Sequence, residues 1–150
     1  MKTAVLALIT ALTLSGCMSY NLHTYGAVDQ NEKSVTVPPG SSGLTGKIKE
    51  ALSKSGWKMA VRGGPRVTEG RLGDNTRLEQ YDTFHTRYEL ILKWHQYDTC
   101  ISNFSPALFY DITLIDNKTN SEVISLDGRG CEYVVVEKFT EAMNGTGQSQ

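Results

Sequence analysis

The chain has 150 residues, with 15 lysines and arginines against 16 aspartates and glutamates and a net charge of −1. That length suits a single domain. The balanced charge argues against nucleic acid as a partner, because proteins that bind nucleic acid concentrate Lys and Arg on one surface. The sequence contains no internal repeat.

The first sixteen residues have the layout of a secretory signal peptide. Lys2 is followed by an apolar run from Ala4 to Leu14, which is the order of charge and apolar residues in such peptides. The run is too short to cross a membrane, since a transmembrane helix needs about 20 apolar residues. We expect residues 1–16 to be removed on export. The loss of Lys2 then leaves 134 residues, with 14 basic and 16 acidic side chains.

The apolar run ends in Leu14-Ser15-Gly16-Cys17, which resembles the lipobox of bacterial lipoproteins. The resemblance implies cleavage before Cys17, a diacylglyceryl group on its thiol, and acylation of the new amino terminus. Two or more acyl chains hold a protein stably on a membrane, whereas one binds only marginally. The alternative is an ordinary secretory signal in which Cys17 is incidental.

The residues after the cysteine bear on which membrane carries the protein. In proteobacterial lipoproteins an aspartate after the cysteine favours retention at the inner membrane, and here Met18-Ser19 follows. The resemblance therefore implies a lipid-anchored protein of the outer membrane, with its domain facing the periplasm.

The rest of the chain divides into three parts. Residues 17–34 are polar and lack a period, so we interpret them as the lipidated N-terminus and a tether. Residues 35–143 are expected to form one α+β domain, and residues 144–150 a disordered tail.

The domain is predicted to begin with a strand–helix–strand unit. A strand over 34–37 is stopped by Pro38-Pro39-Gly40. Ser41 or Ser42 then caps a helix, which ends near Gly56 and is followed by a strand over 57–62. The apolar residues of the helix recur on one face, and they are Leu44, Ile48, Ala51 and Leu52.

Residues 63–80 are rich in glycine and arginine and show no hydrophobic period, which predicts a long flexible loop. Because long loops inside compact domains are often functional, we regard Arg66, Arg71 and Arg77 as a possible partner-binding set. A surface excursion without a role is the alternative.

The second half is predicted to be a meander closed by a helix. Strands are expected over 83–97, 107–116 and 121–128, from alternation of apolar and polar residues, and a helix over 132–143. Together, these predicted elements indicate an α+β fold, with an antiparallel sheet of about four to five strands and two helices on one face. Their order along the chain is β-α-β-β-β-β-α.

The two remaining cysteines are predicted to form a disulfide. Cys100 and Cys131 each follow a strand of the meander, and those two strands run in the same direction on either side of a third. Their ends therefore meet at one edge of the sheet, within reach of the about 5.5 Å that a disulfide requires. Export to an oxidising compartment supports the bond. Two buried free thiols are the alternative.

Several short segments of the mature chain together carry a second resemblance. They are Ile48-Lys49-Glu50-Ala51-Leu52, Gly56-Trp57, Tyr88, Trp94, Tyr110-Asp111-Ile112, Gly128-Arg129-Gly130 and Lys138-Phe139-Thr140-Glu141-Ala142. With these segments the chain resembles the small Sbal-3080-type lipoproteins, and more loosely the sheet-and-helix domain of curli-secretion and penicillin-binding-protein-activator lipoproteins. These families supply no catalytic residues to match.

The sequence contains no recognisable catalytic set, metal-binding motif or cofactor-binding motif. His85 and His95 are ten residues apart on one strand, about 33 Å, and lack compact ligand spacing. We therefore expect a noncatalytic binding or accessory lipoprotein that docks an envelope protein. The alternatives are a small envelope enzyme or ligand-binding protein, and a structural envelope component that self-associates. Five aromatic residues near one hairpin end are expected to pack in the core. If two or three of them are exposed beside the 63–80 loop, they form a docking patch instead. They are Trp94, Tyr97, Phe104, Phe109 and Tyr110.

Overall fold

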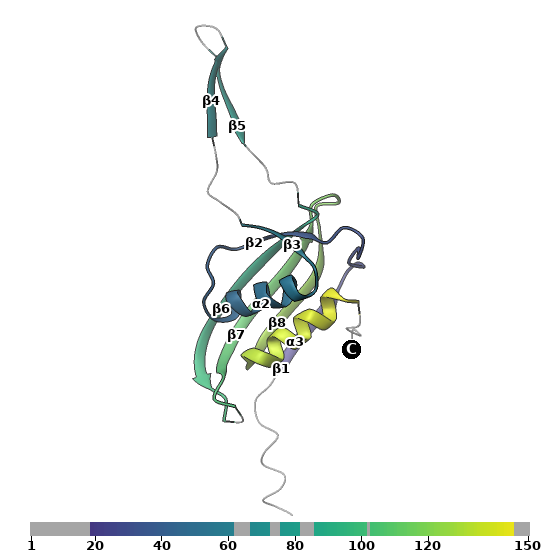
Figure 1. Cartoon of the computed structure of the whole chain (residues 1–150), viewed down its shortest axis with the longest axis vertical. Coiled ribbons are helices and arrows are strands. Elements are labelled where there is room, and N and C mark those ends of the chain that lie inside the picture. Colours follow the sequence, from purple (N-terminus) through teal and green to yellow (C-terminus); the bar gives the residue numbers. More distant parts are fainter. Residues whose placement is uncertain (1–18, 62–66, 73–75, 82–85, 102, 146–150) are drawn as a thin grey trace, which may run out of the picture.

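A computed structural model describes residues 19–61, 67–72, 76–81, 86–101 and 103–145. Figure 1 shows two helices against the same face of a long sheet, with a separate hairpin projecting from one end of it. In chain order the elements are β1 (Ser19–Thr24), β2 (Ser34–Val37), α2 (Gly43–Lys54), β3 (Lys58–Val61), β4 (Val67–Leu72), β5 (Thr76–Tyr81), β6 (Tyr88–Thr99), β7 (Pro106–Asp116), β8 (Ser121–Cys131) and α3 (Glu132–Met143).

Six of these strands form one mixed sheet in the order β1-β8-β7-β6-β2-β3. The first four pair antiparallel, whereas β2 is parallel to both β6 and β3. The predicted α+β class with two helices is confirmed, but the prediction of an antiparallel sheet of four to five strands is wrong. The parallel pairing arises because the helix α2 connects β2 to β3, and such a crossover brings the chain back in the same direction.

The strand β1 lies in the segment that we had interpreted as a tether. Its six residues pair with β8, beginning with Ser19 opposite Arg129. The sequence hides this strand because only Tyr20 and Leu22 are large and apolar, too few to reveal an alternation. The folded domain therefore starts well before the predicted boundary at residue 35.

The core lies between the sheet and the two helices. The helix α2 buries Leu44, Ile48 and Leu52 at the predicted spacing, and α3 has the predicted bounds. Each such side chain contributes about 1.5–3 kcal/mol when fully buried. The other large core residues are Val35, Val37, Tyr88, Leu90, Leu108, Ile112, Leu114, Ile124, Leu126, Val135 and Phe139.

The first turn of α2 packs against the side chain of Trp94. A Cβ atom at Gly43 would collide with the Trp94 ring, and the indole N–H donates to the Thr45 hydroxyl at 3.1 Å. Ser42 is the N-cap residue, although its side chain makes no capping hydrogen bond. The glycine at the helix start is thus explained by close packing.

The predicted loop 63–80 contains a hairpin. β4 pairs antiparallel with β5 over six residues each, and Figure 1 shows this hairpin at the end of the molecule away from the turn between β6 and β7. The loop prediction was wrong because the many glycines and arginines obscure two six-residue segments that contain the β-favouring residues Val67, Thr68, Thr76 and Tyr81.

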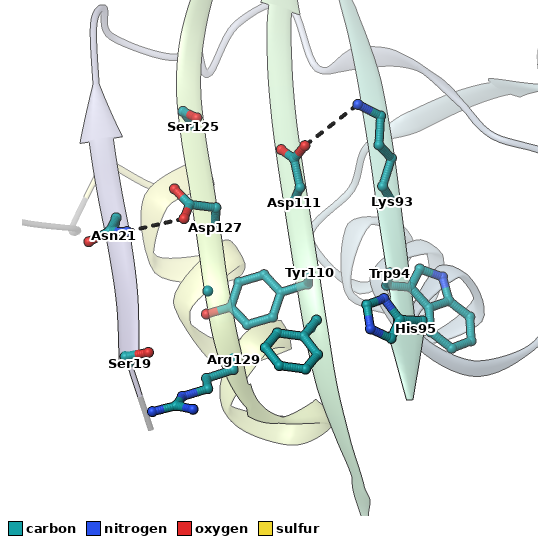
Figure 2. Close-up of a pocket in the computed structure, with 12 residues that line it drawn as sticks. Ser19, Asn21, Lys93, Trp94, His95, Tyr110, Asp111, Ser125, Asp127 and Arg129 are labelled. Atoms are coloured by element: carbon teal, nitrogen blue, oxygen red, sulfur yellow. Dashed lines mark hydrogen bonds and ion pairs between the residues drawn. The ribbon is translucent and has the colours of Figure 1, made fainter. Parts of the chain in front are cut away.

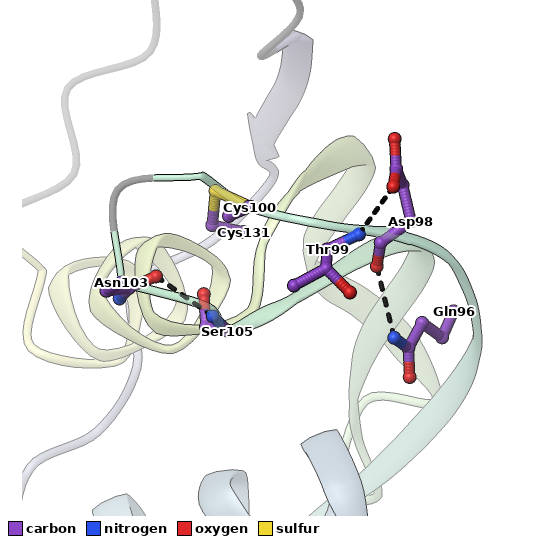
Figure 3. The surroundings of a disulfide bond; sticks show 7 residues. All are labelled: Gln96, Asp98, Thr99, Cys100, Asn103, Ser105 and Cys131. Carbon is purple, nitrogen blue, oxygen red and sulfur yellow. Dashed lines mark hydrogen bonds between the residues drawn. A yellow bond between two sulfur atoms is a disulfide. The ribbon is translucent and has the colours of Figure 1, made fainter.

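The predicted disulfide is present and joins Cys100 to Cys131, whose Cα atoms are 6.0 Å apart. Cys131 is the last residue of β8 and lies opposite Ala107, while Thr99 lies opposite Pro106. The bond therefore ties the turn between β6 and β7 to the start of α3, as Figure 3 shows.

Candidate functional site

The face of the sheet opposite the helices is open, and its side chains form rows across four strands. Successive residues of a strand point to opposite faces, so the strand register determines which residues share a row. Figure 2 shows two of these rows side by side. From β1 to β6 they are Ser19, Arg129, Phe109 and His95, then Asn21, Asp127, Asp111 and Lys93, and a third row follows with His23, Ser125, Thr113 and Ile91.

The first two rows border an open hollow of about 920 Å³. The strands β1, β8, β7 and β6 all contribute to its wall, so the hollow exists only when these four strands have assembled. Its lining combines hydroxyl, amide, carboxylate, imidazole and guanidinium groups with aromatic rings. A surface of this kind can bind a partner that offers both hydrogen-bonding groups and apolar contact.

Two carboxylates lie at the centre of the hollow. Asp111 and Asp127 are directly opposite each other on neighbouring antiparallel strands, an arrangement that is unfavourable for like charges. Each has a partner on its outer side. The ammonium of Lys93 lies 3.6 Å from Asp111, and the amide of Asn21 donates to Asp127 at 3.1 Å. Only one of the two negative charges therefore has a cationic partner in this row.

The row that contains Arg129 and Phe109 becomes aromatic toward β6. The ring of Phe109 lies 5.1 Å from that of His95 and 4.5 Å from that of Tyr97, measured between ring centroids. Phe109 and Tyr97 are both exposed. The open face thus offers a polar and charged row across all four strands, beside a row that becomes aromatic over β7 and β6.

Tyr110 and Gly128 are opposite each other on β7 and β8, next to the carboxylates. Burial, followed by the charges of Asp127 and Tyr20, raises the pKa of Tyr110 to about 12. A Cβ atom at Gly128 would collide with the carbonyl oxygen of Ser19. The glycine therefore allows β1 to approach β8 and to complete the wall of the hollow.

The residues singled out from the sequence lie in different places. Cys17 and Arg66 lie outside the described residues. Arg71 and Arg77 are cross-strand partners in the β4–β5 hairpin, so the register brings two of the three predicted arginines together. His85, which we had considered as a metal ligand, also lies outside the described residues.

The aromatic residues that we had grouped at one hairpin end separate into two sets. Trp94 is half-buried and Tyr110 is buried, whereas Tyr97, Phe104 and Phe109 are exposed. The exposed set lies along β6, β7 and their turn, far from the β4–β5 hairpin in Figure 1. The exposed rings therefore do not lie beside the β4–β5 hairpin, where the expected docking patch would require them.

The carboxylate pair was missed from the sequence. Asp111 and Asp127 both occupy the polar parity of a predicted strand, which was the available signal. Their proximity depends on the register of β7 against β8, and that register is not visible in the separate strands.

No group of three or more His, Cys, Asp or Glu side chains in the described part of the chain is placed to hold a metal ion. None of the helices there is both long enough and apolar enough to span a bilayer.

Comparisons with known proteins give a likeness of fold. No protein-family model matches the sequence, and no curated protein matches it. A solved structure of the PelC dodecamer from Paraburkholderia phytofirmans superposes with a TM-score of 0.51 at 9% identity, covering 89% of this chain and 100% of that one. A single-substitution variant of that dodecamer gives a TM-score of 0.48 at 12% identity, with the same coverage. The chain therefore shares its fold with PelC.

Proposed function

We propose that this protein is a noncatalytic accessory lipoprotein of the bacterial cell envelope, anchored by lipid on Cys17 and binding an envelope protein through the open face of its sheet. The observation that carries the anchor is the sequence Leu14-Ser15-Gly16-Cys17, which ends two residues before β1 begins at Ser19. Because Met18-Ser19 follows the cysteine, we propose the outer membrane, with the domain in the periplasm.

The anchor is tested by intact mass and membrane fractionation of the wild-type protein and of Cys17→Ser. We expect the wild type to lose residues 1–16, to gain the mass of acyl chains and to float with membranes. We expect the variant to be unacylated. A soluble, unacylated wild-type protein would refute the anchor.

The geometry of the hollow supports a partner that carries a positive charge. Asp111 and Asp127 face each other with one ammonium, Lys93, in their row, so a basic side chain of the partner can neutralise the remaining carboxylate. The neighbouring rings of Phe109 and Tyr97 supply apolar contact area, and aromatic residues of this kind are enriched in protein interfaces.

This binding surface is tested with a photo-crosslinking residue in place of Ser125, which lies on β8 beside the hollow. We expect a discrete crosslinked product in living cells that is lost in Asp111→Asn/Asp127→Asn. Glu137→Gln is the matched control, because Glu137 is an exposed carboxylate on α3, on the other face of the sheet. If the control removes the product as well, or neither variant does, the hollow is not the docking surface.

A second candidate function is that of a self-assembling structural component. It is favoured by the fold shared with PelC, whose solved form is a dodecamer. It is also favoured by the edge strand β3, on which Met59 and Val61 are exposed, since an exposed apolar edge can pair with another chain. Light scattering of the mature protein separates the two. A large assembly that Val61→Lys dissociates supports the structural role, and a monomer excludes it.

A further inference from the structure

The turn between β6 and β7 exposes two large apolar side chains. Ile101 is 92% exposed and Phe104 is 85% exposed, more than any other large hydrophobic residue of the described chain. Single exposed apolar residues are common on protein surfaces. Two on one short turn, almost fully in water, point to an apolar surface that the turn contacts.

The turn is held in shape rather than left free. The backbone N–H of Phe104 donates to the carbonyl of Cys100 at 2.9 Å, and the N–H of Cys100 donates to the carbonyl of Ser105 at 2.8 Å. Asn103 accepts from the N–H of Ser105 at 3.1 Å, as Figure 3 shows. The disulfide anchors Cys100 to Cys131. This framework holds the turn that carries both apolar side chains.

Phe104 adopts a backbone conformation that its side chain does not favour. Its φ angle is 56°, in the left-handed region that bulky residues rarely occupy. Strained residues of this kind persist only when their surroundings impose them, and they gather at functional positions. The turn therefore presents an aromatic ring where a glycine or asparagine is the easier choice.

The chain enters β1 from its proposed lipid anchor at the same end of the sheet as this turn. β1 begins at Ser19 opposite Arg129, and Arg129 lies opposite Phe109. β1 then runs away from the turn, because it is antiparallel to β8, which ends near the turn at Cys131. Cys17 precedes Ser19 by two residues, a reach of about 7 Å. Lipid on Cys17 and the exposed turn therefore belong to one end of the molecule.

The composition of the turn itself suits a membrane interface. From Thr99 to Tyr110 the sequence contains no charged residue. The exposed ring of Tyr133 lies nearby, at the start of α3. Tyrosine is enriched at the level of lipid headgroups.

We propose that the side chains of Ile101 and Phe104 insert into the interfacial region of the lipid bilayer, beside the acylated Cys17. The inference rests on the proposed lipid anchor and adds an orientation to it. With the turn in the interface, the strands β6, β7 and β8 stand away from the membrane, and the β4–β5 hairpin is held at the far end, where Figure 1 places it.

The test uses the acylated full chain in vesicles of phosphatidylethanolamine and phosphatidylglycerol, with lipids brominated near the top of their acyl chains. Phe104→Trp is the reporter, and Tyr25→Trp is the matched control, because Tyr25 is 65% exposed just past the other end of β1. We expect the brominated lipids to quench the tryptophan emission of Phe104→Trp more than that of the wild-type protein. We expect them to quench the emission of Tyr25→Trp no more than that of the wild-type protein. Equal quenching of the two variants, or none in either, would overturn the inference.

A second variant separates insertion from anchoring. Asparagine tolerates the left-handed conformation, so Ile101→Asn/Phe104→Asn removes the apolar groups and keeps the turn. With Tyr133→Trp as the reporter, we expect this variant to lose the quenching while its acyl mass and its flotation with vesicles remain. Unchanged quenching refutes the contact and leaves the anchor standing.

The remaining outcomes are also decisive. A wild-type chain without acyl mass contradicts the proposed function. Phe104→Trp is then mixed unacylated with the same vesicles, and absence of quenching there overturns the insertion as well. Trp emission that shifts to the blue without bromine quenching, and only at high protein concentration, assigns the turn to a contact between copies of the chain.

Discussion

The guanidinium of Arg87 donates to the carboxylate of Asp116 over 2.6 Å, at the end of the sheet farthest from the β6–β7 turn. Only 15% of the Arg87 side chain and 9% of the Asp116 side chain are exposed. Arg87 also lies 3.3 Å from Glu32, which in turn pairs with Lys118 at 2.6 Å. The cluster ties the segment before β2 to the starts of β6 and the β7–β8 turn.

Arg87→Met is expected to destabilise the domain by about 1–3 kcal/mol, because it leaves the nearly buried carboxylate of Asp116 without its cation. Urea unfolding measures the change. Lys54→Met is the control, since the Lys54–Glu50 pair is exposed and pairs of that kind contribute about 0.3–0.5 kcal/mol. Similar losses in both variants would show that the Arg87 cluster is no stronger than a surface pair.

Acid is expected to weaken the same cluster. Burial alone would raise the pKa of Asp116, but the backbone N–H of Lys118 and the Arg87 guanidinium outweigh it, so the pKa lies below its ordinary value. The contribution is therefore complete above about pH 3.9, the unfolded value, and is lost as the pH falls through the folded-state pKa. Across this range, the free energy of unfolding should depend less on pH in Asp116→Asn than in the wild-type protein. Glu122→Gln, which removes an exposed carboxylate, should retain the wild-type slope.

Alkali is expected to act through Tyr110. Its pKa of about 12 in the folded chain exceeds the unfolded value of about 10. Between these values the unfolded state releases the proton first, so stability falls by up to about 2–3 kcal/mol. Tyr110→Phe should flatten this decline, whereas Tyr97→Phe, at an exposed position, should leave it unchanged. A decline that persists in Tyr110→Phe would assign it to other groups.

The predictable elements are those in which apolar residues recur regularly over many positions and form one buried side. The helices α2 and α3 and the strands β6, β7 and β8 repeat apolar residues often enough to be recognised. The Cys100–Cys131 bond followed from the directions of those strands. The likeness to lipoproteins at Cys17 stays a prediction, because it depends on residues before the described part of the chain.

The parts that were not predictable depend on pairing. β1 is short and mostly exposed, so it exists because β8 offers a free edge, which no local pattern reveals. The parallel position of β2 between β6 and β3 is likewise a choice among edges. The pairing of Asp111 with Asp127 is set by register, since a shift of one residue would send one of them to the core.

Loss of the disulfide is expected to lower the free energy of unfolding by about 3–4 kcal/mol, because the bond closes a loop between residues separated by 31 positions and restricts the unfolded chain. Urea unfolding of Cys100→Ser/Cys131→Ser measures this. The variant should be insensitive to reductant, while the wild type should fall to the level of the variant when reduced. A wild type whose stability does not change on reduction would contradict the prediction.

Gly128→Ala is expected to loosen β1 and to open the hollow. Gly128 has a φ angle of 148°, and an added Cβ would meet the Ser19 carbonyl oxygen on β1. Relieving such a collision costs about 1–3 kcal/mol, and amide exchange in β1 should become faster. Gly40→Ala is the matched control, because Gly40 also has a positive φ angle, 98°, with no atom within 4 Å of the added Cβ. The control bears the backbone strain without the collision, so β1 exchange should stay at the wild-type rate in Gly40→Ala. Equal exchange in both variants would mean that the close approach of β1 to β8 does not depend on the glycine.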